Sequence, residues 1–386
     1  MPRRFQVHAS PLLALALGCA SAPSTRQDGT PGAATAQAIE VPVASDVQRL
    51  PRTRVASGLR NPRGLHVLAD GSLLVSEAGT GDPGTGRLLR LHDANGDGDF
   101  DDADERVVLL DAQPSKNIVD LVRRDEVFGM AGIAQGDGTV LVALAFFGGP
   151  TNIFRVVGSE VTAWASTHGN INDLAYDPRR HAWFGVASTS DEVVRLRERG
   201  GAERVAKIPP LAQGQDSVPG YLRHDPVSGA LLVTLFSGSP RGEEGGEGIE
   251  LVPRAGAIVR VDPDTHAIAP EVVGLTAPTD IEFGDDGALY VLEMCDRFLD
   301  PVQNLADLAN RPSHGGFARF SGRLLRVDRA RRTVQVVADG LETPTNLALS
   351  GNALYVSEGM GMPGRLIPTA TGSVPLDGFI ERIQLQ

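Results

Sequence analysis

The chain has 386 residues, of which 41% are hydrophobic and 22% charged, so it can bury a large core and is not disordered by composition. Its 45 glycines and 26 prolines favour many short strands joined by turns over long helices. A formal net charge of −12 argues against a nucleic-acid partner, because nucleic-acid binding needs a basic surface.

The N-terminus has the pattern of an export signal. Arg3 and Arg4 precede the apolar run Pro11–Leu17, which is too short to cross a bilayer. Small residues then lead into Cys19, as in the processing site of bacterial lipoproteins. We therefore expect residues 1–18 to be a lipoprotein-type signal peptide and Cys19 to be lipidated. The alternative is ordinary secretory cleavage nearby.

This signal predicts an exported protein at the bacterial cell envelope, anchored by lipid in the outer membrane or facing the periplasm. Residues 19–45 are rich in Ala, Ser, Thr, Gly and Pro, which is typical of a flexible tether. With Cys19 lipidated, Cys295 is the one remaining cysteine, so we expect no internal disulfide. Residues 46–386 are expected to form a single, monomeric domain that contacts the membrane only through Cys19.

Internal repetition is the strongest signal in the rest of the chain. Two apolar residues and an arginine recur in six places, at Arg90, Arg155, Arg195, Arg260, Arg326 and Arg382. Two apolar runs separated by a turn rich in Gly or Asp precede each of these elements, which is typical of a hairpin. A fourth run follows at residues 106–110 and 333–337. Six such units predict an all-β fold, a six-bladed β-propeller of four-stranded blades.

The sixth unit has three strands where the others have four. Residues 46–57, just before the first unit, form a strand with no partner in their own unit. We expect this N-terminal strand to fill the vacant position of the sixth unit and close the ring, because closure removes open sheet edges.

The units resemble those of NHL-type and SMP-30/gluconolactonase-type propellers. The run from Asn61 to Gly79, with its NPRGL and DGSLLVSEAG segments, is most similar to the ScyD/ScyE-like family of exported propellers. The resemblance covers about residues 50–386. It implies the fold strongly and the chemistry weakly, because propellers carry many unrelated functions.

In propellers of this kind the first strand of each blade lines the central channel. The loops between second and third strands lie on the rim where ligands usually bind. In blades four, five and six these loops are long, at residues 236–255, 295–321 and 359–377. The sequence therefore predicts a ligand site on this rim. The alternative is that the loops only cover the core.

Oxygen-bearing side chains are expected at the channel entrance. Asp173, Asp280 and Asn346 occupy the same repeat position in three blades, and Asn172 resembles the metal-ligating Asn of gluconolactonase-like propellers. Converging carboxylate and amide oxygens suit a hard cation such as Ca²⁺. These four residues are thus candidate ligands of a second divalent metal, unless they only bind channel water.

Charged residues complete the predicted ligand site. The acidic members end second strands, and they are Glu77, Glu293 and Glu358. The basic members are Arg63, Arg223, Arg297 and Arg319, most of them expected on insertions. Histidine titrates near neutrality, so His224 and His314 are candidate catalytic bases. The alternative role for each is a structural hydrogen bond.

One local motif is more specific. Residues 93–104 fit the pattern D-x-N-x-D-G-x5-D of an EF-hand-like calcium loop, without flanking helices, as in dockerins. The predicted ligands are the side chains of Asp93, Asn95, Asp97, Asp101 and Asp104 and the carbonyl of Asp99. The loop joins the third and fourth strands of blade one, on the face opposite the predicted ligand rim. We therefore expect a structural calcium ion.

The sequence leaves three functions open. The first is a metal-assisted hydrolase of a small polar lactone or ester, similar to gluconolactonase. The second is a sorbosone- or glucose-dehydrogenase-like enzyme that uses the quinone PQQ, with Arg223, Arg297 and Arg319 as candidate cations for its carboxylates. The third is a non-catalytic binding or assembly module of the envelope. We expect binding of a small sugar- or lactone-like ligand, with hydrolysis as the best enzymatic interpretation.

Overall fold

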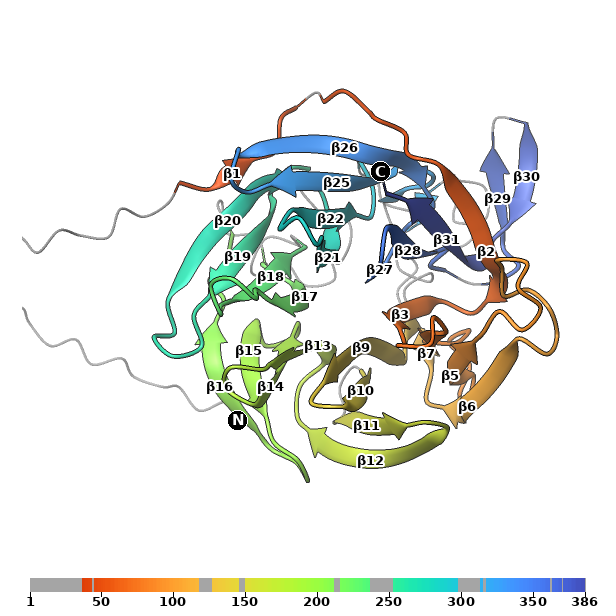
Figure 1. Ribbon diagram of the computed structural model, residues 1–386, viewed down its shortest axis with the longest axis horizontal. Helices are drawn as coiled ribbons and strands as arrows, with labels where there is room; N and C mark the ends of the chain where they lie inside the picture. Colours follow the sequence, from red (N-terminus) through yellow and green to blue (C-terminus); the bar gives the residue numbers. More distant parts are fainter. Residues whose placement is uncertain are drawn as a thin grey trace, which may run out of the picture. The chain divides into compact units, whose positions relative to one another are not determined.

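The computed structural model describes residues 37–43, 45–117, 127–145, 150–211, 216–236, 253–297, 313–314, 317–361, 363–369 and 371–385. The regular elements of this part of the chain are β-strands, and six sheets of four antiparallel strands are arranged in a ring (Figure 1). The predicted six-bladed β-propeller is confirmed. Within the same residues, no helix is long and apolar enough to cross a membrane.

The blades follow one another in chain order, and in each the first strand is innermost (Figure 1). Blade 1 contains β3 (Pro62–Val67), β4 (Leu73–Glu77), β5 (Gly86–Leu91) and β6 (Arg106–Gln113). Blade 2 contains β9 (Met130–Gly136), β10 (Thr139–Leu144), β11 (Thr151–Val157) and β12 (Glu160–Thr167). Blade 3 contains β13 (Ile171–Asp177), β14 (Ala182–Ala187), β15 (Glu192–Leu196) and β16 (Ala202–Lys207).

The second half of the ring repeats this order. Blade 4 contains β17 (Pro219–His224), β18 (Leu231–Leu235), β19 (Gly256–Val261) and β20 (Ile268–Leu275). Blade 5 contains β21 (Pro278–Phe283), β22 (Leu289–Glu293), β25 (Gly322–Asp328) and β26 (Thr333–Leu341). Blade 6 contains β27 (Asn346–Ser350), β28 (Ala353–Glu358), β31 (Gly378–Gln384) and β2 (Arg52–Leu59). Short hairpins lie outside the blades: β7 (Lys116–Asn117) with β8 (Val127–Phe128), β23 (Ser313–His314) with β24 (Phe317–Ala318), and β29 (Leu366–Thr369) with β30 (Gly372–Pro375).

The ring closes through the N-terminal strand, as predicted. β2 pairs antiparallel with β31 and forms the outermost strand of blade 6. Ala56 lies opposite Ile380, and both side chains are fully buried in the contact between blades 6 and 1. Figure 1 shows these two strands, from opposite ends of the colour scale, side by side.

A further short strand, β1 (Ile39–Glu40), pairs in parallel with the outer edge of blade 4. Ile39 and Val41 are buried in the contact between blades 4 and 5. The packed part of the chain thus begins within residues 19–45, the segment that the sequence assigned to a tether.

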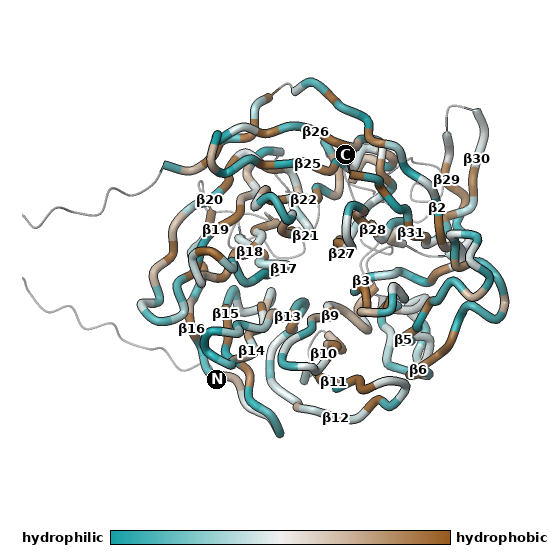
Figure 2. The backbone as a smooth tube through the Cα atoms, viewed as in Figure 1, coloured by the Kyte–Doolittle hydropathy of each residue, from teal (hydrophilic) through white to brown (hydrophobic). Residues whose placement is uncertain are grey.

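The hydrophobic core lies between neighbouring blades. Second strands are covered on both faces, so all of β4 is buried. The outermost strands face solvent, and Val108 of β6 is 46% exposed. Figure 2 shows this distribution, with apolar segments along inner strands such as β10 and hydrophilic segments in many connecting turns.

The recurring arginine of the third strand stabilises the blade itself. In blades 1 and 5, Arg90 and Arg326 form ion pairs with Asp70 and Asp286, which lie in the turn between first and second strands. In blade 4, Arg260 pairs instead with Glu271 of the neighbouring fourth strand. The repeat that reveals the fold in the sequence is therefore also a structural contact.

Candidate functional site

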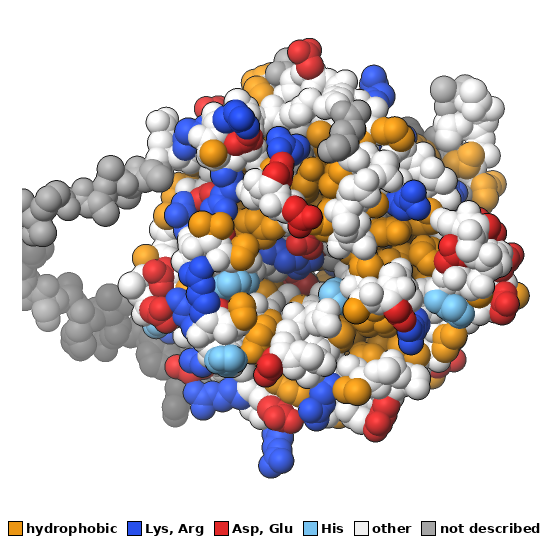
Figure 3. All heavy atoms as spheres, in the orientation of Figure 1, with side chains coloured by type: hydrophobic (Ala, Val, Ile, Leu, Met, Phe, Trp, Pro, Cys, Tyr) orange, Lys and Arg blue, Asp and Glu red, His pale blue; other side chains and the backbone are white. Residues whose placement is uncertain are grey.

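A cavity of about 480 Å³ opens at the centre of the ring, where the six first strands end. Its polar lining consists of His66, Gln135, Tyr176, Arg223, His224 and Glu282. Apolar residues of the same strands, such as Leu65 and Leu174, form the rest of the wall. Figure 3 shows this face, with basic and histidine side chains beside the central hollow.

This cavity lies at the opposite end of the channel from the predicted rim. The lining residues stand near the turns between first and second strands, whereas the prediction concerned the loops between second and third strands. Most of two of those loops, residues 237–252 and 298–312, lies outside the described residues. The cavity is therefore an additional finding, and the rim prediction stays untested.

Arg223 is the central charge of the channel. It lies on β17 and not on an insertion, and its side chain is only 15% exposed. One guanidinium nitrogen donates to Asp173 Oδ2 at 2.8 Å and another to Asp280 Oδ2 at 3.0 Å. The third nitrogen lies 3.5 Å from Glu282 Oε2. One cation thus joins acids from blades 3 and 5 to blade 4.

Backbone groups and an amide complete this network. Asp173 Oδ2 accepts a hydrogen bond from the Leu222 amide at 3.1 Å. Asp280 Oδ2 accepts hydrogen bonds from the Leu347 amide at 2.9 Å and from Asn346 Nδ2 at 3.1 Å. The structure therefore brings together Asp173, Asp280 and Asn346, the three residues that share one repeat position.

Local backbone features direct these acids inward. The first strands of blades 3 and 5 shift register at Asp173 and Asp280, and such bulges turn side chains out of the regular alternation. Glycine at the matching position of blade 2 leaves the necessary room. A Cβ on Gly132 would lie 2.1 Å from Asp173 Oδ1, so only glycine fits beside this carboxylate.

Burial shifts the titration of the whole cluster. It raises the pKa of Asp173 to about 7, although Arg223 acts in the opposite direction. It also raises the pKa of Asp280 and of Glu282 above their usual values, again against Arg223. Burial alone would lower the pKa of Arg223, but the three carboxylates raise it, so this guanidinium stays charged.

His224 lies beside the cluster and has an acidic neighbour. Its Nε2 lies 3.2 Å from Oδ1 of Asp177, at the end of β13. Asp177 is fixed by an ion pair with Arg180 and by the backbone amide of Arg179 at 2.8 Å. Burial lowers the pKa of His224, which favours the neutral imidazole near neutral pH. A neutral imidazole beside a fixed carboxylate is an arrangement typical of a general base.

Sequence reasoning missed five polar residues at the centre: His66, Gln135, Tyr176, Tyr221 and Glu282. His66 Nε2 lies 3.0 Å from Gln135 Oε1, and burial lowers the pKa of His66. Tyr221 is buried next to the cluster, and burial raises its pKa to about 12. The only signal in the sequence was position, because each of these residues lies in a first strand.

The predicted acidic arc has a structural role in two of its three members. Glu77 accepts a hydrogen bond from the Arg60 amide at 2.8 Å and pairs with Arg87. Glu293 makes the same contacts with the Thr276 amide, at 2.6 Å, and with Arg323. Each glutamate therefore fastens a second strand to the link that enters its blade.

The third member, Glu358, accepts a hydrogen bond from the Glu342 amide at 2.5 Å. Blade 6 has Phe379 at the position of the pairing arginine. The pKa of Glu358 is raised well above its usual value, mainly by burial and secondly by the negative charge of the nearby Glu381. None of the three glutamates lines the central cavity.

The remaining predicted residues lie apart from the cavity. Arg63 donates to the Val127 carbonyl at 3.1 Å, and the exposed Arg297 pairs with its neighbour Asp296. Arg319 is buried against Glu342 and the Met360 carbonyl. His314 lies in β23, but its side chain, like Cys19, is outside the described part of the chain.

The predicted channel metal stays a prediction. Three buried oxygens near the centre, Asn172 Oδ1, Asp173 Oδ1 and Asn346 Oδ1, have no hydrogen-bond partner within the described residues. Such oxygens suit a hard cation or water. However, the guanidinium of Arg223 already supplies a positive charge between Asp173 and Asp280.

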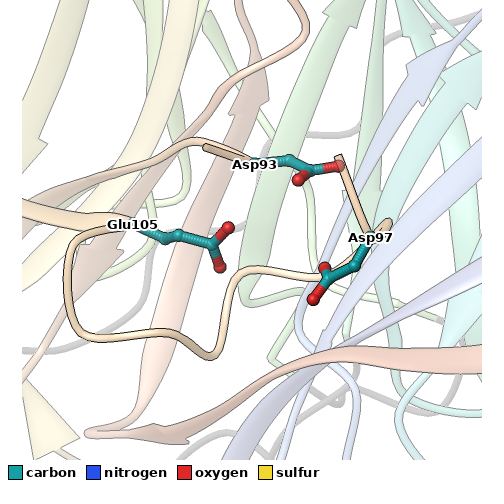
Figure 4. A group of neighbouring side chains, drawn as sticks. All are labelled: Asp93, Asp97 and Glu105. Carbon is teal, nitrogen blue, oxygen red and sulfur yellow. The ribbon is translucent and has the colours of Figure 1, made fainter. Parts of the chain in front are cut away.

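The acidic loop between β5 and β6 brings together some of its predicted ligands (Figure 4). One carboxylate oxygen from each of Asp93, Asp97 and Glu105 lies within 4.8 Å of the other two. Asn95 hydrogen-bonds Asp97 from both ends of its amide. Glu105, one position beyond the predicted last ligand Asp104, is fully buried and belongs to this group.

One other predicted ligand, Asp101, has different contacts. The Asp99 side chain accepts a hydrogen bond from the Asp101 amide at 2.9 Å, and the role of the Asp99 carbonyl as a ligand stays a prediction. Asp101 faces away from the three carboxylates, since it accepts a hydrogen bond from the Ser57 amide at 2.8 Å and pairs with Arg106. Ser57 belongs to the closing strand β2, so the loop is fastened to the strand that completes the ring.

No protein-family model matches the chain, and no curated protein does. Among solved structures, a protein of unknown function from Bacteroides thetaiotaomicron is 11% identical over 89% of this chain and 75% of that one, with a TM-score of 0.51. A Thermus thermophilus protein named as a candidate oxidoreductase (glucose dehydrogenase) is 14% identical over 86% and 99%, with a TM-score of 0.51. The likeness is to β-propellers. At these identities it shows the fold alone, and the narrower resemblance to NHL-type and ScyD/ScyE-like propellers stays a prediction.

Replacing Arg223 by methionine tests the central charge. The variant leaves the buried Asp173 and Asp280, and the partly exposed Glu282, without their cation, which is expected to cost about 3–5 kcal/mol of unfolding free energy at pH 8. Because the pKa of Asp173 is raised on folding, proton binding by this group contributes to the unfolding free energy. This contribution is fully present below pH 3.8, the usual pKa of the group, and is lost as pH rises through about 7. The protonated acids repel less at pH 5, so we expect a smaller loss there. Urea unfolding at pH 8 and at pH 5 measures the loss of unfolding free energy. The role of Arg223 as the central charge is contradicted if the loss is equal at both pH values, or if Arg297→Met causes the same loss.

Proposed function

We propose that this protein binds a small, uncharged polar ligand of the sugar or lactone class in the central cavity. The observation that carries the proposal is the convergence of six polar side chains on one central cavity, five of them with shifted pKa values. Concave sites with few convergent polar groups and perturbed titration are the usual form of small-molecule sites.

The size and chemistry of the cavity support this ligand class. About 480 Å³ falls within the range of small-ligand pockets, roughly 300–1,000 Å³. Glu282 is 25% exposed and can accept hydrogen bonds from ligand hydroxyls, while Gln135 and Tyr176 can both donate and accept them. Around the cavity, the acids Asp173, Asp280 and Glu282 outnumber Arg223, which disfavours an anionic ligand.

Hydrolysis is the enzymatic function that the His224–Asp177 contact favours. A neutral His224 would take a proton from water as the water oxygen bonds to the lactone carbonyl carbon. Cleavage of the ring C–O bond would then return the proton to the leaving oxygen and give a hydroxy acid. Asp177 acts as a positioning residue, because its negative charge stabilises the imidazolium that forms.

The other interpretations have less support from the described geometry. A quinone-dependent dehydrogenase needs several cations around one cofactor, but Arg297 and Arg319 do not line the cavity that contains Arg223. A non-catalytic module of the envelope is distinguished by the absence of turnover. It would share the ligand site but not the role of His224.

Titration of glucono-δ-lactone, with binding measured by calorimetry and acid release in a pH-stat, tests the proposal. We expect saturable binding that Glu282→Ala weakens, and acid release that His224→Gln lowers by about 10²–10⁴-fold with binding retained. The lowered pKa of His224 predicts that activity persists to pH values below 6.5. His168→Gln, an exposed histidine outside the cavity, serves as the control.

Each outcome has a distinct meaning. If neither glucono-δ-lactone nor glucose binds saturably, the central cavity is not the ligand site. Binding without acid release retains the ligand site and rejects the hydrolase. Acid release that is equally lost in His168→Gln rejects His224 as the base.

We also propose a structural calcium ion in the loop at residues 93–105. The support is the grouping of Asp93, Asp97 and Glu105, because several carboxylates so close together repel unless a cation is present. The loop contacts the closing strand, where the Phe100 amide donates to the Val55 carbonyl at 2.7 Å. Calcium bound here would stabilise the closure of the ring.

Thermal unfolding with and without calcium tests this ion. Calcium is expected to raise the melting temperature of the wild type by several degrees, since a ligand of the folded state stabilises it. Glu105→Gln should abolish the increase. Asp104→Asn should retain it, because Asp104 lies outside the carboxylate group. If instead Asp104→Asn abolishes the increase and Glu105→Gln retains it, the ligand set predicted from the sequence, which ends at Asp104, is the correct one.

Export and lipid anchoring at Cys19 remain our proposal for the location of the protein. The support is the sequence pattern alone. Expressed in a bacterium that processes lipoproteins, the wild type should fractionate with membranes, and Cys19→Ser should be released from them. Cys295→Ser, which changes a buried free thiol, should behave like the wild type. Membrane association of Cys19→Ser would refute the anchor.

A further inference from the structure

A second cavity, of about 550 Å³, lies between blades 2 and 3, apart from the central site. Both tryptophans of the chain, Trp164 and Trp183, line it. Its charged lining consists of Arg155, Arg195, Arg197, Asp137, His181 and Glu198. We propose that this cavity, called here the tryptophan groove, binds an acidic saccharide through an indole face and a guanidinium.

The aromatic side chains form a fixed platform. The rings of Trp164 and Trp183 meet edge to face, with centroids 6.3 Å apart and an angle of 62°. The Tyr176 ring also packs against Trp183, with centroids 5.0 Å apart and an angle of 51°. Trp183 is therefore fixed by two aromatic neighbours but is only partly buried. A rigid indole with accessible surface offers the apolar contact that the C–H face of a sugar ring requires.

The arginines of the groove differ from their counterparts in other blades. Arg155 and Arg195 occupy the recurring third-strand position, where Arg90, Arg260 and Arg326 are closely paired with acids of their own blades. Arg155 instead reaches only Glu198, at 3.5 Å across to blade 3. The side chain of Arg195 forms no ion pair or hydrogen bond within the described part of the chain.

The cause of this difference is visible in the turns. In blade 3 the turn between the first and second strands, residues 178–181, contains no acid, so Arg195 lacks the partner that Arg90 and Arg326 have. Asp177, at the end of β13, pairs with Arg180 and faces His224. Arg195 is exposed and retains all of its donors for a ligand. A guanidinium binds a carboxylate with two parallel hydrogen bonds, which is the basis for choosing an acidic saccharide.

The other polar groups suit sugar hydroxyls. Asp137 and Glu198 are exposed acceptors on either side of the groove. Thr139 adds a hydroxyl. The His181 ring, whose Nδ1 lies 3.3 Å from the Tyr176 hydroxyl, adds a further polar edge.

Arg197 pairs with Glu203 at 2.8 Å and Arg155 with Glu198 at 3.5 Å, so Arg195 is the guanidinium of the groove that is left for a ligand. Within the described residues, an exposed, unpaired cation distinguishes the groove from the central cavity, where Arg223 is paired with acids.

Tryptophan fluorescence measures this proposal directly, because both tryptophans of the chain line the groove. The probes are cellobiouronate and cellobiose, which differ in one carboxylate. We expect cellobiouronate to change the emission saturably and to bind at least about tenfold more tightly than cellobiose. Arg195→Gln should raise the Kd for cellobiouronate by about tenfold or more, because one charge-assisted pair is lost.

Arg382→Gln is the matched control, since Arg382 holds the same third-strand position in blade 6 and lines a different cavity. It should bind cellobiouronate like the wild type. The proposal is overturned if cellobiouronate causes no saturable change, if cellobiose binds equally well, or if both arginine variants lose binding alike. A failure of lactone binding in the central cavity leaves this result unaffected.

Discussion

The buried charge of Arg223 is the constraint on which the centre of this propeller depends. Three carboxylates face the channel from blades 3 and 5, and without a cation their burial would destabilise the ring. The guanidinium is planar and has five donors, so it can serve several acids at once. The same residue supplies part of the lining of the central cavity. Stability and the candidate site therefore share one side chain.

The candidate ligand sites lie where the contacts of a blade differ from those of the repeat. Where the third-strand arginine pairs with its turn acid, as Arg90 does with Asp70, the charge of the arginine is balanced within the blade and is not available to a ligand. In blade 3 the turn contains no acid, so Arg195 is left exposed, and Asp177 at the end of the first strand faces His224. These two features contribute to the tryptophan groove and to the central cavity, respectively. Identical blades would have neither.

The repeat made the fold predictable, because strand order, blade count and closure by β2 all follow from periodic apolar runs and a missing fourth strand. It also placed Asp173, Asp280 and Asn346 at one level of the channel. The sequence could not show that Arg223 reaches across to Asp280, because that contact joins residues 57 positions apart through a bulge. Glu105 was missed because the consensus spacing ends one residue earlier, at Asp104. Glu77 differs from an exposed acid on the rim because it is buried and paired with Arg87. Neither property can be recognised from the sequence around Glu77.

The two cavities have opposite electrostatic character. At the centre, the acids exceed the one buried arginine, and the raised pKa of Asp173 means that this group still binds protons near neutral pH. A ligand there gains most by donating hydrogen bonds, as a neutral polyol does. In the tryptophan groove Arg195 is exposed and unpaired within the described residues, so a carboxylate is favoured. Tyr176 lines the central cavity and packs against Trp183, whose ring belongs to the groove. One aromatic contact, with ring centroids 5.0 Å apart, therefore lies between a residue of the central cavity and a residue of the groove.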